Sequence, residues 1–233
     1  MVLERIIALT LSYLLGALPI GWIIVWLIAH KDIRYHASGR MGTSNVIRMV
    51  GVPAGILNSV LDFLKGYAGV WVISLIIEDA PQWMKALGGF LAVLGHIYSI
   101  YIIEKRRDGK YYFRGGAGGM TSVGAAVAFW PPVLLWSGIP VLLMYLLLGY
   151  ASITTMSVNF FALIVFIVRA ATGADPGWWY VVYSVATLLL VIDALRPNIQ
   201  RLQRKEERIM RFSLHARLKA KREREKQSKA GEE

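Results

Sequence analysis

The 233-residue chain has no cysteine, which excludes disulfide bonds, thiol chemistry and cysteine-based metal sites. It has no GxxxxGKS/T segment, so a P-loop is excluded, and no His, Asp or Glu set with the spacing of a metal site. Acidic residues are scarce, because 15 Asp and Glu stand against 26 Lys and Arg. Apolar residues are abundant: 56% of the chain is hydrophobic and the mean hydropathy is +0.49. We therefore expect a protein that crosses a membrane several times.

Seven apolar stretches are candidates for membrane-spanning helices, with about 20 residues needed for each crossing. The fourth and fifth share one apolar run, which we divide at Pro131-Pro132 because two prolines cannot continue a helix. If that run were one kinked helix, six spans would remain. The expected spans cover residues 5–29, 54–78, 83–103, 117–130, 132–149, 151–169 and 177–194.

Lys and Arg are concentrated in residues 30–53, residues 104–116 and the tail after Leu195, which alone holds thirteen. Cationic loops stay on the cytoplasmic side of a membrane. Seven spans place all three segments on one side, whereas six would put the tail opposite the second loop. The expected fold is therefore an all-α membrane protein of about seven transmembrane helices, with the N-terminus outside and the C-terminus in the cytoplasm.

Composition divides the chain into a membrane domain, residues 1–195, and a basic cytoplasmic tail, residues 196–233, that we expect to be partly helical at the membrane surface. A net charge of +11 suggests nucleic acid at first sight. In a membrane protein such charge more often reflects topology or anionic lipid. We expect membrane lipids as partners and no nucleic acid.

The loop of residues 30–53 mixes cations, hydroxyl groups and glycines soon after the first apolar stretch ends. Its backbone N–H groups can converge on an anion, and an arginine can hold a phosphate with paired donors. The alternative is a solvated loop that only sets topology. Ser38 lacks both a GxSxG context and an evident base, so we do not expect a covalent serine enzyme.

A second loop, Arg114 to Gly124, is rich in glycine and precedes the fourth span. Glycine lets backbone approach a phosphate closely, although it also serves tight helix packing in membranes. Asp62 and Lys65, three residues apart within a span, lie on one helix face, where we expect an ion pair that fixes helix packing. A lone histidine such as His96 is more often structural than a base.

These segments resemble the motifs of the bacterial acyl-phosphate:glycerol-3-phosphate acyltransferase family, in matching order. The family patterns are GSxPxG, DIR, GSGNxGATNxxRxxG, DxxKG, GHxFPxF, FKGGKGVAT and HRxNIxRLxxGxE. Their counterparts here are GALPIG (Gly16–Gly21), DIR (Asp32–Arg34), ASGRMGTSNVIRMVG (Ala37–Gly51), DFLKG (Asp62–Gly66), GHIYSIY (Gly95–Tyr101), FRGGAGGMT (Phe113–Thr121) and LRPNIQRLQRKEE (Leu195–Glu207).

The resemblance implies an enzyme of phospholipid synthesis in the inner (plasma) membrane of a bacterium. It would transfer a fatty acyl group from acyl phosphate to the 1-hydroxyl of glycerol 3-phosphate, giving lysophosphatidic acid without a cofactor. The implied catalytic residues are Ser38, Arg48 and Asn198. The implied phosphate-binding residues are Asn45, Arg114, Gly115, Gly116, Gly118 and Thr121. The implied supporting residues are Asp62, Lys65, His96 and Glu207.

The chain departs from the family motifs in three places. Ala117 stands where the family loop has a lysine, and Leu195 where the last motif has a histidine, both of which bind phosphate in the family. About nine extra residues, 104–112, precede the glycines. Their cations Lys105, Arg106, Arg107 and Lys110 either replace the missing charge or form a solvated loop. The resemblance places Arg48 at a family arginine and Arg40 at a variable-looking asparagine, so that we expect Arg48 to matter more than Arg40.

Two alternatives to this activity remain open. One is a member of the family that has changed its acyl acceptor or donor. The other is a lipid- or anion-binding membrane protein without catalytic activity. A transporter is less favoured, because the polar residues gather at one face of the membrane rather than near its midplane.

Overall fold

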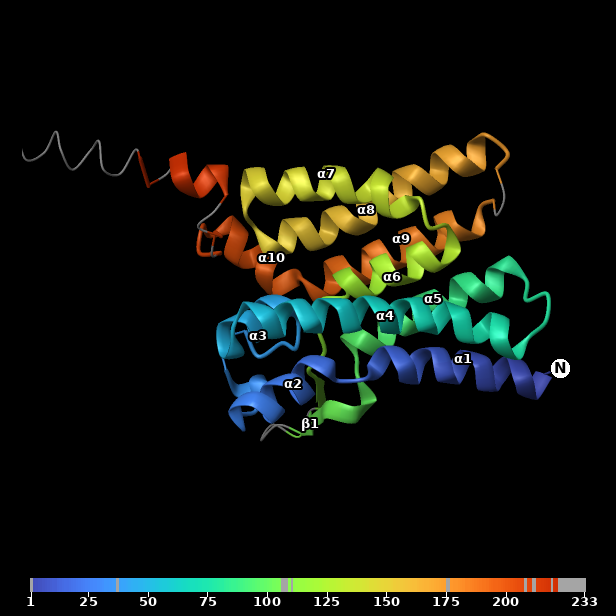
Figure 1. The fold of residues 1–233 in the computed structure, drawn as a ribbon, viewed down its shortest axis with the longest axis horizontal. Helices are drawn as coiled ribbons and strands as arrows, with labels where there is room; N and C mark the ends of the chain where they lie inside the picture. Colours follow the sequence, from blue (N-terminus) through green and yellow to red (C-terminus); the bar gives the residue numbers. More distant parts are fainter. Residues whose placement is uncertain are drawn as a thin grey trace, which may run out of the picture.

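The structure is a computed structural model that describes residues 2–36, 38–105, 109, 111–174, 177–207, 209–210, 213–218 and 220–221. Almost all of the described chain is helical (Figure 1), as the apolar pattern predicts. The long helices are α1 (Val2–Ala17), α2 (Ile20–Ala29), α4 (Val52–Ile76), α5 (Gln82–Ile97), α6 (Gly119–Phe129), α7 (Val133–Leu148), α8 (Ala151–Ala171) and α9 (Trp179–Ala194). The short elements are η1 (Ile33–Tyr35), α3 (Thr43–Val50), η2 (Ile100–Ile102), β1 (Ile103–Lys105), β2 (Tyr111–Phe113) and α10 (Arg196–Gln203).

Each of the seven expected apolar stretches is helical in the structure. Four helical stretches are long and apolar enough to cross a membrane: Val2–Ala29, Val52–Ile76, Gln82–Ile102 and Ala151–Ala171. Together α9 and α10 form a fifth candidate, although a 62° bend separates them, and α6 and α7 are shorter apolar helices. The chain is thus a mainly helical membrane protein.

Several local features differ from the expectation. The first stretch is interrupted at Leu18–Pro19, because proline has no N–H to continue the hydrogen-bond ladder of α1. The third helix ends at Ile97, and the extra residues after it build an antiparallel hairpin in which Glu104 is opposite Tyr112. In the tail, α10 is helical, as are residues 214–218 and 220–221.

The helices form two groups that meet at α6 and between α5 and α9 (Figure 1). One group is α1, α4 and α5, the other is α7, α8 and α9, and α6 contacts α4, α5, α8 and α9. Small residues bring α4 and α6 into backbone contact: a Cβ added to Gly66 would lie 1.9 Å from the Thr121 carbonyl oxygen. Gly66 is in the middle of α4 and Thr121 in the first turn of α6. The N-terminus of α6 is therefore recessed to the middle of α4.

Candidate active site

A cavity of about 570 Å³ opens where the basic segments meet. Its walls come from the loop before α3 and from the beginnings of α3, α6, α8 and α10, at the end of the bundle opposite the N-terminus (Figure 1). Eight of the expected site residues line it: Ser38, Asn45, Arg48, Asp62, His96, Gly118, Asn198 and Glu207. Segments as far apart as residues 38 and 207 thus form one site.

Four helices present their N-terminal ends to this cavity. The lining includes Thr43 and Ser44 of α3, Gly119 and Met120 of α6, Ala151 and Ser152 of α8, and Asn198 of α10. None of these helices has a hydrogen bond from a capping side chain at its N-terminus. In α3, α6 and α8 the first N–H groups have no partner within the helix and carry partial positive charge. In α10, by contrast, Pro197 has no N–H, and the Asn198 N–H donates to the Leu195 carbonyl at 2.8 Å. The convergence of the N-termini of α3, α6 and α8 favours an anionic ligand.

Three guanidinium groups also line the cavity, those of Arg40, Arg48 and Arg201. Burial lowers the pKa of Arg40, and the positive charge of Arg201 lowers it further. An arginine nevertheless keeps its proton in proteins. A cavity with three cations and the N-termini of α3, α6 and α8 suits more than one phosphate group.

Asn198 is fixed by a hydrogen-bond network that joins it to α8 and to the segment after α10. Its side-chain nitrogen donates to the Glu207 carboxylate at 3.3 Å, and the Ser152 hydroxyl donates to the other oxygen of that carboxylate at 2.8 Å. Glu207 thus acts on the site by orienting Asn198 and Ser152. The supporting role expected of Glu207 has a structural basis in these two bonds.

Asn45 organises the polar loop from within. Its side-chain nitrogen donates to the backbone carbonyls of His36 at 3.2 Å and Arg40 at 2.8 Å, and the residue is 2% exposed. Because this nitrogen is already engaged, Asn45 shapes the loop around Ser38 rather than offering its N–H groups to a ligand. Its side-chain oxygen has no hydrogen-bond partner.

The expected pair within α4 is confirmed: Lys65 Nζ lies 2.9 Å from the Asp62 carboxylate, and both side chains are buried. Asn58 donates to the other Asp62 oxygen at 2.9 Å, Lys65 donates to the Leu18 carbonyl at 2.9 Å, and His96 Nδ1 lies 3.5 Å from Asp62. The pair therefore joins α4 to α5 and to the break after α1. Asp62 and His96 also face the cavity, whereas Lys65 does not line it.

Two of the expected anion-binding glycines serve close packing on His96. A Cβ at Gly115 would lie 2.1 Å from the His96 carbonyl oxygen, and one at Gly116 would lie 2.1 Å from His96 Nε2. The Gly116 N–H already donates to the His96 carbonyl at 3.0 Å. Only Gly118, with φ +90° just before α6, lines the cavity. Thr121 is fully buried and does not line the cavity either.

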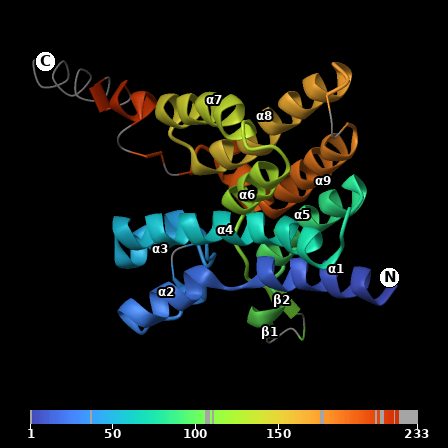
Figure 2. The ribbon, with the colours of Figure 1, turned by 45° about the vertical axis from the view of Figure 1, so that its right-hand side comes forward.

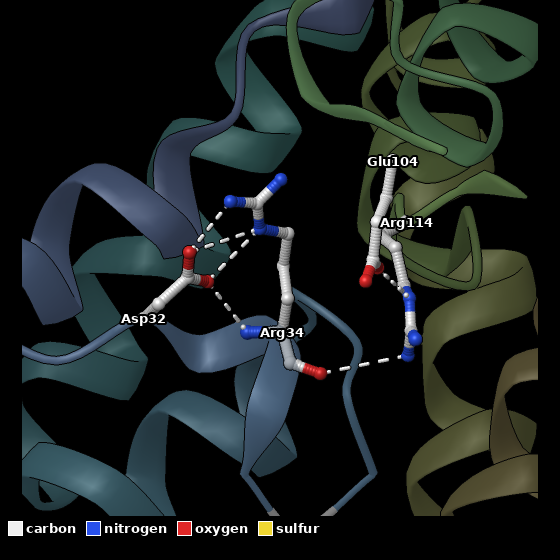
Figure 3. Close-up of polar contacts among 4 residues, drawn as sticks. All are labelled: Asp32, Arg34, Glu104 and Arg114. Atoms are coloured by element: carbon white, nitrogen blue, oxygen red, sulfur yellow. Dashed lines mark hydrogen bonds and ion pairs between the residues drawn. The ribbon is translucent and has the colours of Figure 1, made fainter. Parts of the chain in front are cut away.

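Arg114 also lies outside the cavity lining, within a set of polar contacts at the hairpin (Figure 3). Its Nε lies 3.0 Å from the Glu104 carboxylate, and its Nη1 is 3.5 Å from the Arg34 carbonyl oxygen. Arg34 in turn donates hydrogen bonds to the Asp32 carboxylate. Burial raises the pKa of Asp32, but these hydrogen bonds outweigh that effect, so that the Asp32 pKa lies below its usual value. These contacts join the hairpin to the loop that carries Ser38.

The cations of the insertion do not appear among the lining residues that the structure describes. Lys105 Nζ lies over the Tyr111 ring, 5.7 Å from its centroid. The hairpin lies on the side of α1 and α2, away from α7 and α8 (Figure 2). Arg106, Arg107 and Lys110 fall outside the described residues, so that only Lys105 can be placed, and it is engaged elsewhere.

Sequence reasoning missed several residues that line the cavity. The most notable is Arg40, whose Nη2 donates to the Ala194 carbonyl at the end of α9. Thr43, Ser59, Ser152 and Thr155 also line it. The hydroxyl residues carried no signal of their own, because serine and threonine are common in membrane helices. Arg40 did carry one, since a cation in a glycine-rich loop is a candidate anion ligand.

The fold and cavity define an integral membrane protein with a recessed anion-binding site, and the comparisons name its family. The family profile described as glycerol-3-phosphate acyltransferase matches residues 6–205. The chain belongs to the glycerol-3-phosphate acyltransferase family.

Individual relatives agree along nearly the whole chain. The glycerol-3-phosphate acyltransferase of Halalkalibacterium halodurans is 32% identical over 82% of this chain and 88% of its own. That of Lactiplantibacillus plantarum is 32% identical over 91% of this chain and 95% of its own. The crystal structure of PlsY, an integral membrane glycerol 3-phosphate acyltransferase, in its glycerol 3-phosphate form is 29% identical, with a TM-score of 0.74 over 88% of this chain and 95% of that one.

Proposed function

We propose that this protein transfers a fatty acyl group from acyl phosphate to the 1-hydroxyl of glycerol 3-phosphate and releases lysophosphatidic acid and inorganic phosphate. The observation that carries the proposal is one cavity in which the N-termini of α3, α6 and α8 and three arginines converge. Family membership and the similarity to PlsY structures in their glycerol 3-phosphate and lysophosphatidic acid forms support the choice of substrate.

The reaction needs little beyond positioning and charge neutralisation, because acyl phosphate is already an activated anhydride. The hydroxyl oxygen of glycerol 3-phosphate attacks the acyl carbon, and the bond from that carbon to the phosphate oxygen breaks. The hydroxyl proton leaves with the phosphate. No group of the protein becomes acylated, and no cofactor is required.

Different residues of the chain bind the phosphates, orient the acceptor and contact the acyl chain. Ser38, Arg48 and the first turns of α3 and α6 bind the phosphates, and Asn198, held by Glu207, orients the acceptor. The side chains of Met120 and Met210 also line the cavity, and their apolar surface would contact the first part of the acyl chain. The remainder of the chain extends into lipid, since many large apolar side chains are exposed along the helices.

The activity is tested with purified protein and glycerol 3-phosphate, offering acyl phosphate, acyl-CoA or acyl-carrier protein as donor in separate reactions. Lysophosphatidic acid formed from acyl phosphate alone supports the proposal. Product from another donor only would indicate a changed donor. The absence of product with every donor would instead indicate a lipid- or anion-binding protein without catalytic activity.

We infer that all seven apolar helices cross the bacterial plasma membrane, with the N-terminus outside and the cavity open to the cytoplasm. The Lys and Arg content of residues 30–53, 104–116 and the tail supports this orientation. Because the chain lacks cysteine, single cysteines at Gly42, Gly109 and Gly173 report on it directly. A membrane-impermeant thiol reagent added outside the cell should label only Gly173→Cys. Labelling of Gly42→Cys or Gly109→Cys from outside would overturn the orientation.

A further inference from the structure

One wall of the cavity is apolar at both positions where the family motifs have a cation or a donor. Ala117 and Leu195 both line the cavity. Leu195 is buried in a cluster with Val93, Ile97 and Val191, and Ala117 packs against the same cluster. The two departures are therefore not independent, because together they convert one polar wall into a continuous apolar surface. A phosphate placed against it would lack a partner on that side.

Arg40 lies beside this wall. Its Nη2 donates to the Ala194 carbonyl, which immediately precedes Leu195 in the chain. Its Nη1 is buried and has no hydrogen-bond partner. A buried, charged N–H group without a partner is costly, and a guanidinium that already uses one nitrogen keeps its remaining donors aligned for an oxyanion. The group thus has both the position and the free donors to bind phosphate.

We propose that Arg40 is a substrate-binding residue that holds a substrate phosphate in place of the cation missing at Ala117 and Leu195. The proposal rests on the proposed function for the identity of the substrate. The phosphate belongs either to glycerol 3-phosphate or to acyl phosphate, since both carry the dianion that a guanidinium recognises. The insertion was the other candidate source of a replacing cation. Its described cation, Lys105, lies over Tyr111 and is not part of the cavity lining.

The test is a cross-over between the two walls. We expect Arg40→Gln to raise KM for one phosphate substrate at least about tenfold, and titrating each substrate in turn identifies which phosphate Arg40 holds. Adding Ala117→Lys to Arg40→Gln should restore most of the lost affinity, because the lysine brings a cation back to the apolar wall beside position 40. In the protein that keeps Arg40, Ala117→Lys should lower KM by a smaller factor than it does in Arg40→Gln.

Arg196→Gln is the matched control. It removes one positive charge from the same junction of α9 and α10, but its side chain is 75% exposed, pairs with Asp193 and does not line the cavity. We expect its KM for either substrate to stay within twofold of the unmodified protein. Arg40→Lys keeps the charge without the planar group and should fall between the unmodified protein and Arg40→Gln.

Two results would overturn the proposal. One is an Arg40→Gln protein with unchanged KM and kcat. The other is a loss of activity in Arg40→Gln that comes with a lower melting temperature and is not relieved by Ala117→Lys, because Arg40 would then only support the end of α9. If the unmodified protein is inactive with every donor, the proposed function fails separately. Inorganic phosphate should then still raise the melting temperature of the unmodified protein more than that of Arg40→Gln, and an equal rise would exclude Arg40.

Discussion

The middle of α6 and its first residues lie in contrasting surroundings. In the middle of the helix, a Cβ at Gly124 would lie 1.9 Å from the Phe63 carbonyl oxygen, so that α6 and α4 touch backbone to backbone. At the N-terminal end, Gly118, Gly119 and Met120 face the cavity. Small residues thus serve packing where α6 meets α4 and exposure of N–H groups where the helix begins at the cavity. The comparison separates substitutions that should unfold the protein from those that should only weaken ligand binding.

The largest effect is expected in the middle of α6, where the helix packs against α4. Gly124→Leu would force α6 away from α4, and we expect destabilisation by about 3 kcal/mol or more, with loss of folded protein in detergent. Gly138→Leu is the matched control, because a Cβ there meets no atom within 4 Å. Size-exclusion chromatography and melting temperature measure both. Equal stability of the two variants would contradict the backbone contact.

The next largest effect is expected in the cavity that the first residues of α6 face, where Arg48 of α3 is part of the lining. Arg48→Ala should lower kcat/KM by about 2–3 kcal/mol of transition-state stabilisation, roughly a hundredfold, while the protein stays folded. Arg48→Lys should recover only part, because an ammonium group cannot replace two parallel guanidinium donors. Steady-state kinetics with both substrates decide the matter. Activity of Arg48→Ala close to that of the unmodified protein would remove Arg48 from the site.

A smaller effect is expected where the hairpin holds Arg114 against the loop of Ser38. Glu104→Gln removes the charge that pairs with Arg114 at 3.0 Å. The pair is partly exposed, so that we expect no more than about 1 kcal/mol, seen as a rise of up to fivefold in KM. Glu78→Gln, an exposed change at the far end of α4, should have no effect. A fivefold rise in both variants would show that charge rather than this contact matters.

The smallest effect concerns the strained backbone next to Glu207. Lys205 is exposed and has φ +60°, a left-handed conformation that glycine adopts without strain. Lys205→Gly should therefore stabilise the fold by up to about 1 kcal/mol, seen as a higher melting temperature. Lys205→Ala removes the same charge and keeps the strain, so it should not stabilise. A gain in both variants would point to charge repulsion.

The membrane helices could be predicted because apolar runs identify them locally. The helix of residues 54–78 was placed within two residues of α4, and the division at Pro131-Pro132 is where α6 and α7 separate. The Asp62–Lys65 pair was equally predictable, since both residues belong to one helix.

The cavity could be predicted only in part, because its walls depend on packing between distant segments. Nothing local in the sequence shows that Arg40 reaches Ala194, 154 positions away, or that Gly115 and Gly116 pack on His96. The extra residues after Glu104 were expected either to supply cations or to form a loop. Their described part pairs as β1 and β2, because the aromatic residues of β2 favour strand pairing, and the described cation, Lys105, lies over the Tyr111 ring.

The recessed start of α6 has an electrical consequence. Eleven helical residues span only about 16 Å, roughly half of a hydrocarbon core about 30 Å thick. With the proposed orientation, the insulating layer between the cavity floor and the outer surface is correspondingly thin, so the transmembrane voltage falls over a shorter distance there. A phosphate dianion that reaches the first turn of α6 has crossed part of that voltage, and an interior-negative potential favours its entry.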